Sequence, residues 1–333
     1  MKVLITGGAG FIGSTVATAC LEHGITPVLL DDLHTGAAEF TEGRIFYRGD
    51  IADGALLDRI FAEHPEIGAA VHCAALIVVP ESVADPLRYY RVNVAKTVEL
   101  VEHLLRHGCE RLVFSSSAAL YAPPTDGTLV VDEESPTAPS SPYARTKLVA
   151  EQLLQDTAAA TALRVIALRY FNPIGADPEL RTGLRNPAPT HALGRLIQAH
   201  EQGRAFELTG GGWPTPDGSG IRDYVHVWDL ALAHVAALRR FAQVLPAGRG
   251  GFEAVNIGTG TGTTVRELHR AFEQVLGEPL PLREGAARPG DVAGCYPLID
   301  KARRLLDWEP VLTLADGIRD SLAWRARQAE LNR

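Results

Sequence analysis

Short apolar runs alternate in the first half of the chain with longer stretches whose apolar residues recur at helical spacing. The runs at residues 2–6, 27–30, 44–47, 70–73, 112–115 and 165–168 have the length and composition of buried strands. Between them lie amphipathic stretches such as 86–105, in which Leu87, Tyr90, Val94, Val98 and Val101 share one helical face. The alternation predicts an α/β fold, a doubly wound parallel sheet with helices on both faces.

After about residue 172 the pattern becomes irregular, with prolines at 173, 178, 187, 189, 214 and 216 and three consecutive glycines at 210–212. We expect a smaller substrate domain over 176–333, built around a helix at 190–202 and closed by a helix at 314–325 that Thr313 caps. Two β-like runs, 223–227 and 254–257, are predicted to return to the first sheet. The first domain would then comprise 1–175 and the returning segments 223–238 and 254–258, so the two domains interleave.

Three glycines follow the first predicted strand at three-residue spacing, in the sequence TGGAGFIG. Gly7, Gly10 and Gly13 allow a tight turn and a close approach of the backbone to a pyrophosphate, which a helix N-terminus then faces. Asp31 and Asp32 end the next strand, where a carboxylate binds the adenosine ribose and repels a 2′-phosphate. A lone glycine triplet is often only a turn, but the strand, helix, second strand and acid in this order predict a Rossmann-type fold that binds NAD rather than NADP.

Composition and net charge limit the kinds of molecule that the protein is expected to bind. The chain has 333 residues, 46% of them hydrophobic, and a formal charge of −8, with no long basic run. Nucleic acid and anionic membranes are therefore not expected to bind. The N-terminal apolar run is broken by glycines where a signal peptide would continue, and no apolar stretch reaches membrane-spanning length, so we expect a cytoplasmic protein. The four cysteines, Cys20, Cys73, Cys109 and Cys295, have no zinc-type or redox-type spacing, and no metal site is expected.

Catalytic chemistry is indicated at the start of one predicted helix. Tyr143 and Lys147 lie four residues apart after Ser141 and Pro142, so the phenol and the ammonium share a helical face. A nearby ammonium, or an oxidised nicotinamide, lowers the pKa of a tyrosine and makes it a better base. Ser117 ends the fifth predicted strand, where its hydroxyl can bond a substrate oxygen. Each feature alone is more often surface or turn chemistry, but their place in a nucleotide-binding fold favours catalysis.

Six motifs together resemble the UDP-galactose 4-epimerase family of the extended short-chain dehydrogenases/reductases: TGGAGFIG, HCAAL, FSSSAALY, SPYARTK, RYFNPIGAD and PDGSGIRDYVHVWDLA. The resemblance implies tightly bound NAD that oxidises a UDP-sugar at C4 and returns the hydride to the other face of the 4-keto sugar. It implies Tyr143 as base, Lys147 as its activator and Ser117 as the hydroxyl on the sugar oxygen. The cofactor contacts it implies are Gly7, Gly10, Phe11, Ile12, Gly13, Asp31, Asp32, Thr35, Gly36, Asp50, Ile51, Ala74, Ala75, Asn93, Ser115, Tyr143, Lys147 and Tyr170.

The resemblance also implies a nucleotide-sugar site made by Ser117, Tyr143, Asn172, His191, Arg222, Arg288, Asp291 and Cys295. Arg222 and Arg288 would hold the diphosphate and Asp291 the uridine ribose. Two positions depart from the family pattern: Ile77 replaces a lysine near the cofactor phosphates, and His191 replaces an asparagine near the uridine phosphate. Cys295 is small where some relatives carry tyrosine, so we hypothesise that UDP-GlcNAc and UDP-GalNAc are accepted besides UDP-glucose and UDP-galactose.

The sequence is also compatible with other functions. A 4-epimerase for another UDP-sugar, such as UDP-glucuronate or a natural-product sugar, fits the same motifs. A nucleotide-sugar 4,6-dehydratase fits less well, because Ala118 and Ala119 stand where dehydratases place acids. A non-catalytic NAD-binding regulator need not retain Ser117, Tyr143 and Lys147 together. The resemblance further implies a homodimer, formed through the helices at 86–105 and 141–157.

Overall fold

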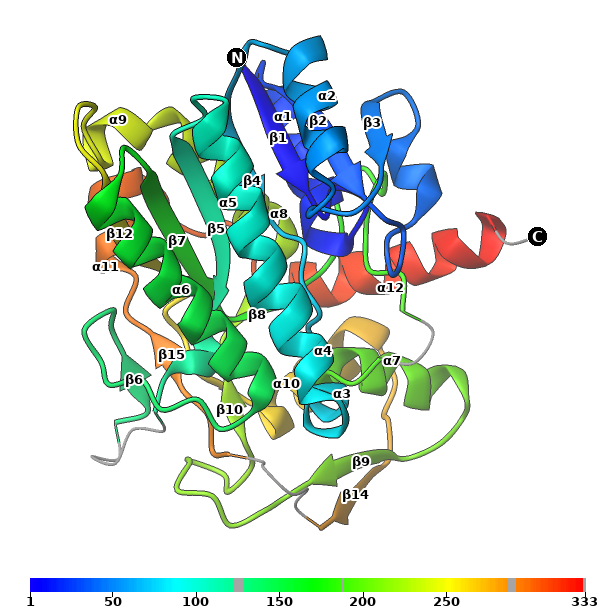
Figure 1. Cartoon of the computed structure of the whole chain (residues 1–333). Helices are drawn as coiled ribbons and strands as arrows, with labels where there is room; N and C mark the ends of the chain where they lie inside the picture. The colour runs from blue at the N-terminus through cyan, green and yellow to red at the C-terminus, as the bar shows by residue number, and fades with distance from the viewer. Residues whose placement is uncertain (123–127, 187–188, 287–291, 332–333) are drawn as a thin grey trace.

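The computed structural model describes residues 1–122, 128–186, 189–286 and 292–331. Its centre is a seven-stranded parallel sheet in which the strands lie in the order β12-β7-β5-β4-β1-β2-β3 (Figure 1). These strands are β1 (Lys2–Thr6), β2 (Thr26–Asp31), β3 (Ile45–Arg48), β4 (Ile67–His72), β5 (Arg111–Ser117), β7 (Arg164–Tyr170) and β12 (Gly251–Ile257). The order reverses between β1 and β4, the position at which doubly wound sheets bind their ligands.

Helices cover both faces of this sheet because successive side chains of a strand point to opposite sides. Val3 and Ile5 pack with α1 (Phe11–Glu22), α8 (Val227–Arg239), α9 (Phe241–Val244) and α11 (Asp300–Leu306), whereas Leu4 packs with α2 (Gly54–Glu63), α5 (Lys96–Arg106) and α6 (Pro142–Ala160). Figure 1 shows α5 and α6 on one face of the sheet, with α8 behind it. The predicted fold class is confirmed.

The helix predicted at 86–105 is present, but it is not uniform. It consists of α4 (Pro86–Tyr90), a π-helical turn η2 (Arg91–Ala95) and α5, and α3 (Val79–Ala84) precedes it. A π-helical turn widens a helix locally and is frequent at functional sites. Two short 3-10 turns, η1 (Ala38–Thr41) and η3 (Ala118–Leu120), follow the ends of β2 and β5. The sequence period alone did not reveal these irregular turns.

The remaining elements form small two-stranded ladders and helices below the carboxyl ends of the large sheet (Figure 1). A second core joins Leu196, Phe206, Phe272 and Ile318. The elements are α7 (Ala192–Glu201), α10 (Val265–Leu276), α12 (Leu314–Leu331), and the strand pairs β9 (Phe206–Thr209) with β14 (Leu282–Gly285), β10 (Ile221–Arg222) with β13 (Thr263–Thr264), β8 (Asn172–Ile174) with β11 (Tyr224–His226), and β6 (Val130–Val131) with β15 (Tyr296–Pro297).

All six predicted strands of the first half are confirmed, with boundaries that differ by three residues at most. The run 254–257 lies in β12 and joins the large sheet, as expected. The expectation that 223–227 also joins it is wrong: β11 pairs with β8 in a separate ladder, and it is α8, directly after β11, that packs on the sheet. Thr313 caps α12 as predicted, since its hydroxyl accepts the Asp316 N–H at 3.2 Å.

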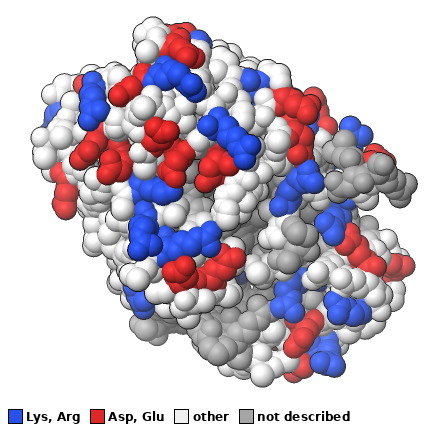
Figure 2. Space-filling model, turned by 45° about the vertical axis from the view of Figure 1, so that its right-hand side comes forward, with Lys and Arg blue, Asp and Glu red and all other residues white. Residues whose placement is uncertain are grey.

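Charged side chains are spread over the surface. On the face shown in Figure 2, lysine and arginine lie among aspartate and glutamate, and one group of adjacent basic side chains is bordered by acidic ones. Among the described residues, no helix combines the length and the apolar character needed to cross a bilayer. All four cysteines are free thiols.

Candidate active site

The glycine-rich loop between β1 and α1 has a backbone that only glycine permits at two positions. Gly7 has a φ of +68°, and a Cβ added to it would lie 2.7 Å from the Ala74 nitrogen. A Cβ added to Gly13 would lie 2.1 Å from the Gly7 carbonyl oxygen. Gly10 is the N-cap of α1, with no side-chain cap bond. The loop therefore presents bare backbone at a helix N-terminus, which fits a pyrophosphate.

Asp31 lies at the end of β2, against the same loop. Its Oδ2 accepts the Ala9 N–H at 3.0 Å and its Oδ1 accepts the Leu33 N–H at 2.8 Å. Burial raises the pKa of this carboxyl, while the two backbone donors act against the increase. The segment with Thr35 and Gly36 folds back onto the loop, since the Ala37 N–H donates to the Ala9 carbonyl at 2.9 Å. Asp31 is thus fixed beside the glycines, whereas Asp32 is exposed.

The segment after β4 forms the other side of the loop and is held by Asn93. The Asn93 amide accepts the Leu76 N–H at 2.8 Å and donates to the Leu76 carbonyl at 2.9 Å and to Thr146 Oγ1 at 3.0 Å. Asn93 therefore connects the backbone beside Ala74 and Ala75 to α6 from within the π-helical turn. Further along the sheet edge, Asp50 pairs with Lys96, and Ile51 is buried.

Tyr143, Lys147 and Ser117 come together at the carboxyl end of β5. Helix α6 begins at Pro142, and Ser141 caps it by accepting the Ala144 N–H at 3.2 Å. The Ser117 hydroxyl lies near the Tyr143 phenol, where it acts to lower the pKa of that group. One turn later, Lys147 is only 5% exposed and its Nζ donates to the Ser115 carbonyl at 2.8 Å. The predicted catalytic residues are thus neighbours.

Burial dominates the electrostatics of this cluster. It lowers the pKa of Lys147 from 10.5 to about 8, against the opposing effect of Cys73 and Glu151. It raises the pKa of Tyr143, and the Ser117 hydroxyl opposes this increase. The expectation that Lys147 lowers the pKa of Tyr143 is not met, because its ammonium contacts the Ser115 carbonyl and lies 5.0 Å from the centre of the Phe114 ring. A cation beside the phenol would favour the phenolate.

Cys73 also belongs to this cluster, although the sequence pattern marked it only as a scattered thiol. Its Sγ accepts the Ser115 hydroxyl at 3.1 Å, and burial raises its pKa to about 11. Tyr170 lies opposite Ser117 in the β5–β7 register, and burial raises its pKa well above the ordinary value, against the effect of Ser115. Cys73 directly follows β4 and therefore stands at the carboxyl edge of the sheet. That position in the sequence could have indicated that it belongs to the site.

A buried ion pair supports α6 behind the catalytic residues. Glu151 lies one turn after Lys147 and binds Arg169 of β7 at 2.7 Å, and both side chains are less than 10% exposed. Glu151 also accepts the Ser116 hydroxyl, and Arg169 donates to the Tyr121 hydroxyl at 3.1 Å. Because Ser116 lies between Ser115 and Ser117, these bonds hold α6 in register with β5 and β7. The i, i+4, i+8 spacing of Tyr143, Lys147 and Glu151 was the sequence signal that was missed.

The predicted nucleotide-sugar residues come from several loops. The guanidinium of Arg222 donates to the carbonyls of Ala293 at 3.0 Å and Val292 at 3.4 Å, and it contributes to the environment of Cys295. Cys295 packs against a cluster that includes Ala118 and Phe171. Asn172 begins β8. Arg288 and Asp291 lie outside the described residues.

His191 occupies a different place from Arg222 and Cys295. It caps α7, since its Nδ1 accepts the Gly194 N–H at 3.1 Å, and burial lowers its pKa to about 4. Its buried Nε2 has no partner among the described residues. The ring lines a cavity together with Phe11, Gly175 and Trp324. Of the predicted site residues, this cavity includes Phe11 and His191 but not the Tyr143 cluster.

Comparison with known proteins decides the family. The model of the NAD-dependent epimerase/dehydratase family matches residues 3–258. The UDP-glucose 4-epimerase of Azospirillum brasilense is 43% identical over 97% of this chain and 91% of its own length, and that of Bacillus subtilis is 40% identical over 98% and 97%. The chain belongs to the NAD-dependent epimerase/dehydratase family.

Solved structures of family members have the same fold over nearly the whole chain. The UDP-glucose 4-epimerase from Stenotrophomonas maltophila, with bound NAD and formylated UDP-arabinopyranose, superposes with a TM-score of 0.93 at 36% identity, covering 99% of each chain. The enzyme from Bifidobacterium longum, in complex with NAD+ and UDP, gives a TM-score of 0.90 at 34% identity and the same coverage. The resemblance drawn from the motifs is confirmed.

The glycine loop of this epimerase/dehydratase family member fits NAD, the family's cofactor. A side chain at Gly7 or Gly13 would clash with the backbone of the loop that faces the pyrophosphate. The carboxylate of Asp31 is held beside this loop. The family also includes dehydratases, but here Ser117 is followed by Ala118 and Ala119, which cannot transfer protons.

Proposed function

We propose that this protein is a UDP-glucose 4-epimerase that interconverts UDP-glucose and UDP-galactose with tightly held NAD. The observation that carries the proposal is the cluster of Ser117, Tyr143 and Lys147 beside a glycine loop that fits a dinucleotide. Relatives about 40% identical over nearly the whole chain carry the name UDP-glucose 4-epimerase, which supports it.

Tyr143 acts as the base in this proposal. Its phenolate takes the proton of the sugar 4-hydroxyl when the sugar is oxidised and returns it when the keto group is reduced. When bound, NAD supplies the acceptor and donor of the hydride at C4. Ser117, whose hydroxyl lies near the Tyr143 phenol, holds the same sugar oxygen. Lys147, oriented by the Ser115 carbonyl, would hold the nicotinamide ribose of NAD.

The residues proposed to bind the nucleotide sugar are Asn172, His191, Arg222 and Cys295, together with Arg288 and Asp291, which lie outside the described residues. The charge of Arg222 acts on the Cys295 thiol, and Cys295 packs against the same small apolar cluster as Ala118, the neighbour of Ser117. A planar guanidinium suits diphosphate oxygens. The shared surroundings of Arg222, Cys295 and Ala118 support a single site in which the diphosphate and the sugar are bound side by side.

Cys295 sets the size of the sugar pocket in this proposal. A thiol occupies much less space than a phenol, so an N-acetyl group at the sugar's 2-position can enter. The test is a coupled assay with purified protein on UDP-glucose, UDP-galactose, UDP-GlcNAc, UDP-GalNAc and UDP-glucuronate. Wild type should convert the first four, and Cys295→Tyr should lose only the N-acetylated pair.

The two parts of this proposal fail separately in that assay. No turnover of UDP-glucose or UDP-galactose would refute the main activity. Turnover of these two without the N-acetylated pair in wild type would refute the role given to Cys295. Turnover of UDP-glucuronate alone would favour an epimerase for that other sugar.

Further proposals concern the organisation of the protein. We place it in the cytoplasm and divide the chain into a cofactor domain over 1–175, with 223–238 and 254–258, and a substrate domain over the remaining residues. We propose a homodimer formed through the helices at 86–105 and 141–157, because Leu87 in the first of them is apolar yet 69% exposed, as are Ile77 and Val83 just before it at 62% and 65%. Sedimentation of Leu87→Glu should give monomers, and a wild type that sediments as a monomer would refute the dimer.

A further inference from the structure

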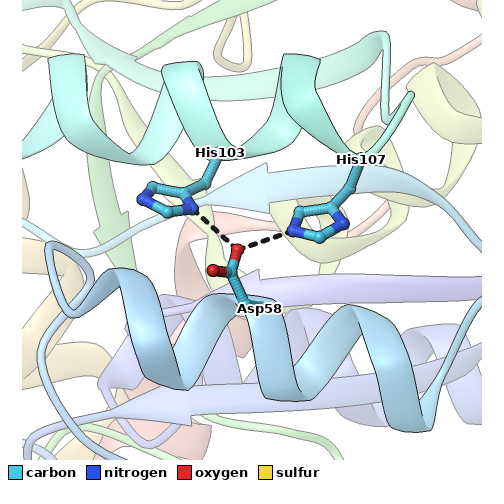
Figure 3. A group of neighbouring side chains, drawn as sticks. All are labelled: Asp58, His103 and His107. Carbon is cyan, nitrogen blue, oxygen red and sulfur yellow. Dashed lines mark hydrogen bonds and ion pairs between the residues drawn. The ribbon is translucent and has the colours of Figure 1, made fainter.

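A group of two histidines and one aspartate joins α2 to α5 on the face of the sheet opposite α1 and α8. Figure 3 shows His103 and His107 of α5 directed at the carboxylate of Asp58 of α2. His103 Nδ1 lies 3.1 Å and His107 Nε2 lies 2.7 Å from the same Asp58 oxygen. The three ligand-type atoms all lie within 4.8 Å of one another. The spacing of the cysteines predicts no metal site, whereas these ligands are histidine and aspartate side chains from two separate segments.

The spacing of the two histidines suits a metal ion. Residues four apart on a helix lie on one face, so their rings can hold one cation between them. A tetrahedral site with bonds of about 2.0–2.2 Å places neighbouring ligand atoms roughly 3.3 Å apart. The distances of 3.1 and 2.7 Å in the cluster are hydrogen-bond distances, and an outward shift of about half an ångström by Asp58 would reach that separation. Asp58, with 48% of its side chain exposed, has room to adjust.

The imidazole rings are already oriented. The His107 ring stacks on Phe61 with ring centres 4.7 Å apart and planes 8° apart. The side chain of His103 is only 10% exposed, and its far edge packs on Gly54, where an added Cβ would lie 2.6 Å from Nε2. A ligand set that is held by packing loses little freedom when a cation binds.

We propose that Asp58, His103 and His107 form a binding site for a divalent transition-metal ion of the zinc class. Two imidazoles and one carboxylate suit Zn²⁺, which takes nitrogen and oxygen ligands, and they suit Mg²⁺ or Ca²⁺ poorly, since those ions prefer oxygen. The exposed side of Asp58 leaves one position for water. The ion would connect α2 to α5.

Arg106 is the feature that opposes the ion. Its Nη1 lies 3.4 Å from His103 Nδ1 and 4.0 Å from the Asp58 oxygen, so its positive charge stands where a cation would bind. The side chain is 58% exposed and can swing into solvent. Arg106 therefore weakens the site without blocking it, and its removal should strengthen binding.

The metal site is separate from the proposed active site. The end of α5 precedes the start of β5 at Arg111, whereas Ser117 stands at the other end of that strand. The ion therefore lies at the amino edge of the sheet and the Tyr143 cluster at the carboxyl edge. We expect the ion to affect stability and to leave turnover unchanged, and the inference does not depend on the proposed epimerase activity.

The test is calorimetric titration of tag-free protein with ZnCl₂, followed by Co²⁺ titration read by visible absorption. Wild type should bind one Zn²⁺ per chain at this site, and Co²⁺ should give the intense bands of a tetrahedral site. His107→Asn should weaken binding by more than about 100-fold, beyond the 10–100-fold loss seen when outer partners are removed. Arg106→Gln should tighten it about thirtyfold, the effect in water of one unit charge on a divalent ion about 4 Å away.

The matched control is His200→Asn. His200 also pairs with a carboxylate, Glu278, at 3.4 Å, but the pair is not part of a three-ligand group among the described residues. Zn²⁺ at ten times its dissociation constant should raise the unfolding midpoint by about 3 °C in wild type and in the control, and not in His107→Asn. Equal Zn²⁺ affinity in wild type and His107→Asn, or no tightening in Arg106→Gln, would overturn the site.

Discussion

The two halves of the molecule obtain their shape in different ways. In the half that holds the glycine loop, seven parallel strands carry apolar cores on both faces, and catalytic groups stand at the strand ends. In the other half, two-stranded ladders and loops surround a smaller core. The large sheet allows Lys147 and Glu151 to be buried and paired. The loops instead place exposed or half-buried groups such as Arg222 from distant segments. The proposed proton transfer therefore belongs to the sheet, and the proposed recognition of substrate belongs to the loops.

The largest expected effect is on kcat, and it distinguishes the proposed base Tyr143 from the proposed substrate-binding residue Arg222. Tyr143→Phe removes the proposed base, and kcat should fall about 10³- to 10⁴-fold, while the bound NAD measured by absorbance stays as in wild type. Arg222→Lys, in the loop half, should raise KM about tenfold and leave kcat within a factor of two, because a bidentate diphosphate contact is lost. Turnover of Tyr143→Phe near that of wild type would contradict the division between the two halves.

The next effect concerns the buried ion pair. Glu151→Gln leaves Arg169 without its charge partner in a site under 10% exposed, so the free energy of unfolding in urea should fall by about 3–4 kcal/mol. Arg319→Gln breaks the Arg319–Asp316 pair, in which Arg319 is 60% exposed, and should cost less than about 1 kcal/mol. Similar losses in both variants would show that burial does not distinguish the two regions.

Lys147 gives a pH-dependent effect. Its pKa is about 8 in the folded protein and 10.5 when unfolded, so the unfolded state binds more protons between these values and the folded state gains stability as pH rises through them. The stability of wild type relative to Lys147→Met should therefore increase from pH 7 to pH 10 by up to about 3 kcal/mol, at 1.36 kcal/mol per unit. Urea unfolding of both proteins at the two pH values measures this. If the difference in unfolding free energy between the two proteins is the same at both pH values, burial does not lower the pKa of Lys147.

Two glycines provide the smallest contrast. Gly13→Ala places a Cβ 2.1 Å from the Gly7 carbonyl, and NAD affinity should drop about 100-fold in a fluorescence titration. Gly211→Ala, in the loop half, adds a Cβ with no described atom within 4 Å and should leave NAD affinity unchanged. An NAD affinity of Gly13→Ala close to that of wild type would mean that the glycine-rich loop makes room for the added Cβ without losing its ability to bind NAD.

Local pattern determined much of this protein. The strands, the amphipathic helices, the glycine loop, the acid at Asp31 and the Tyr143–Lys147 pair all follow from spacings of a few residues, because strand and helix periods are short. Only the tertiary structure brought Cys73 to Ser115 across 42 residues, Glu151 to Arg169 across 18, and Asp58 to the two histidines of α5. It also paired β11 with β8 instead of the large sheet. Such contacts depend on how whole elements pack, and neither period nor composition encodes which distant side chains then meet.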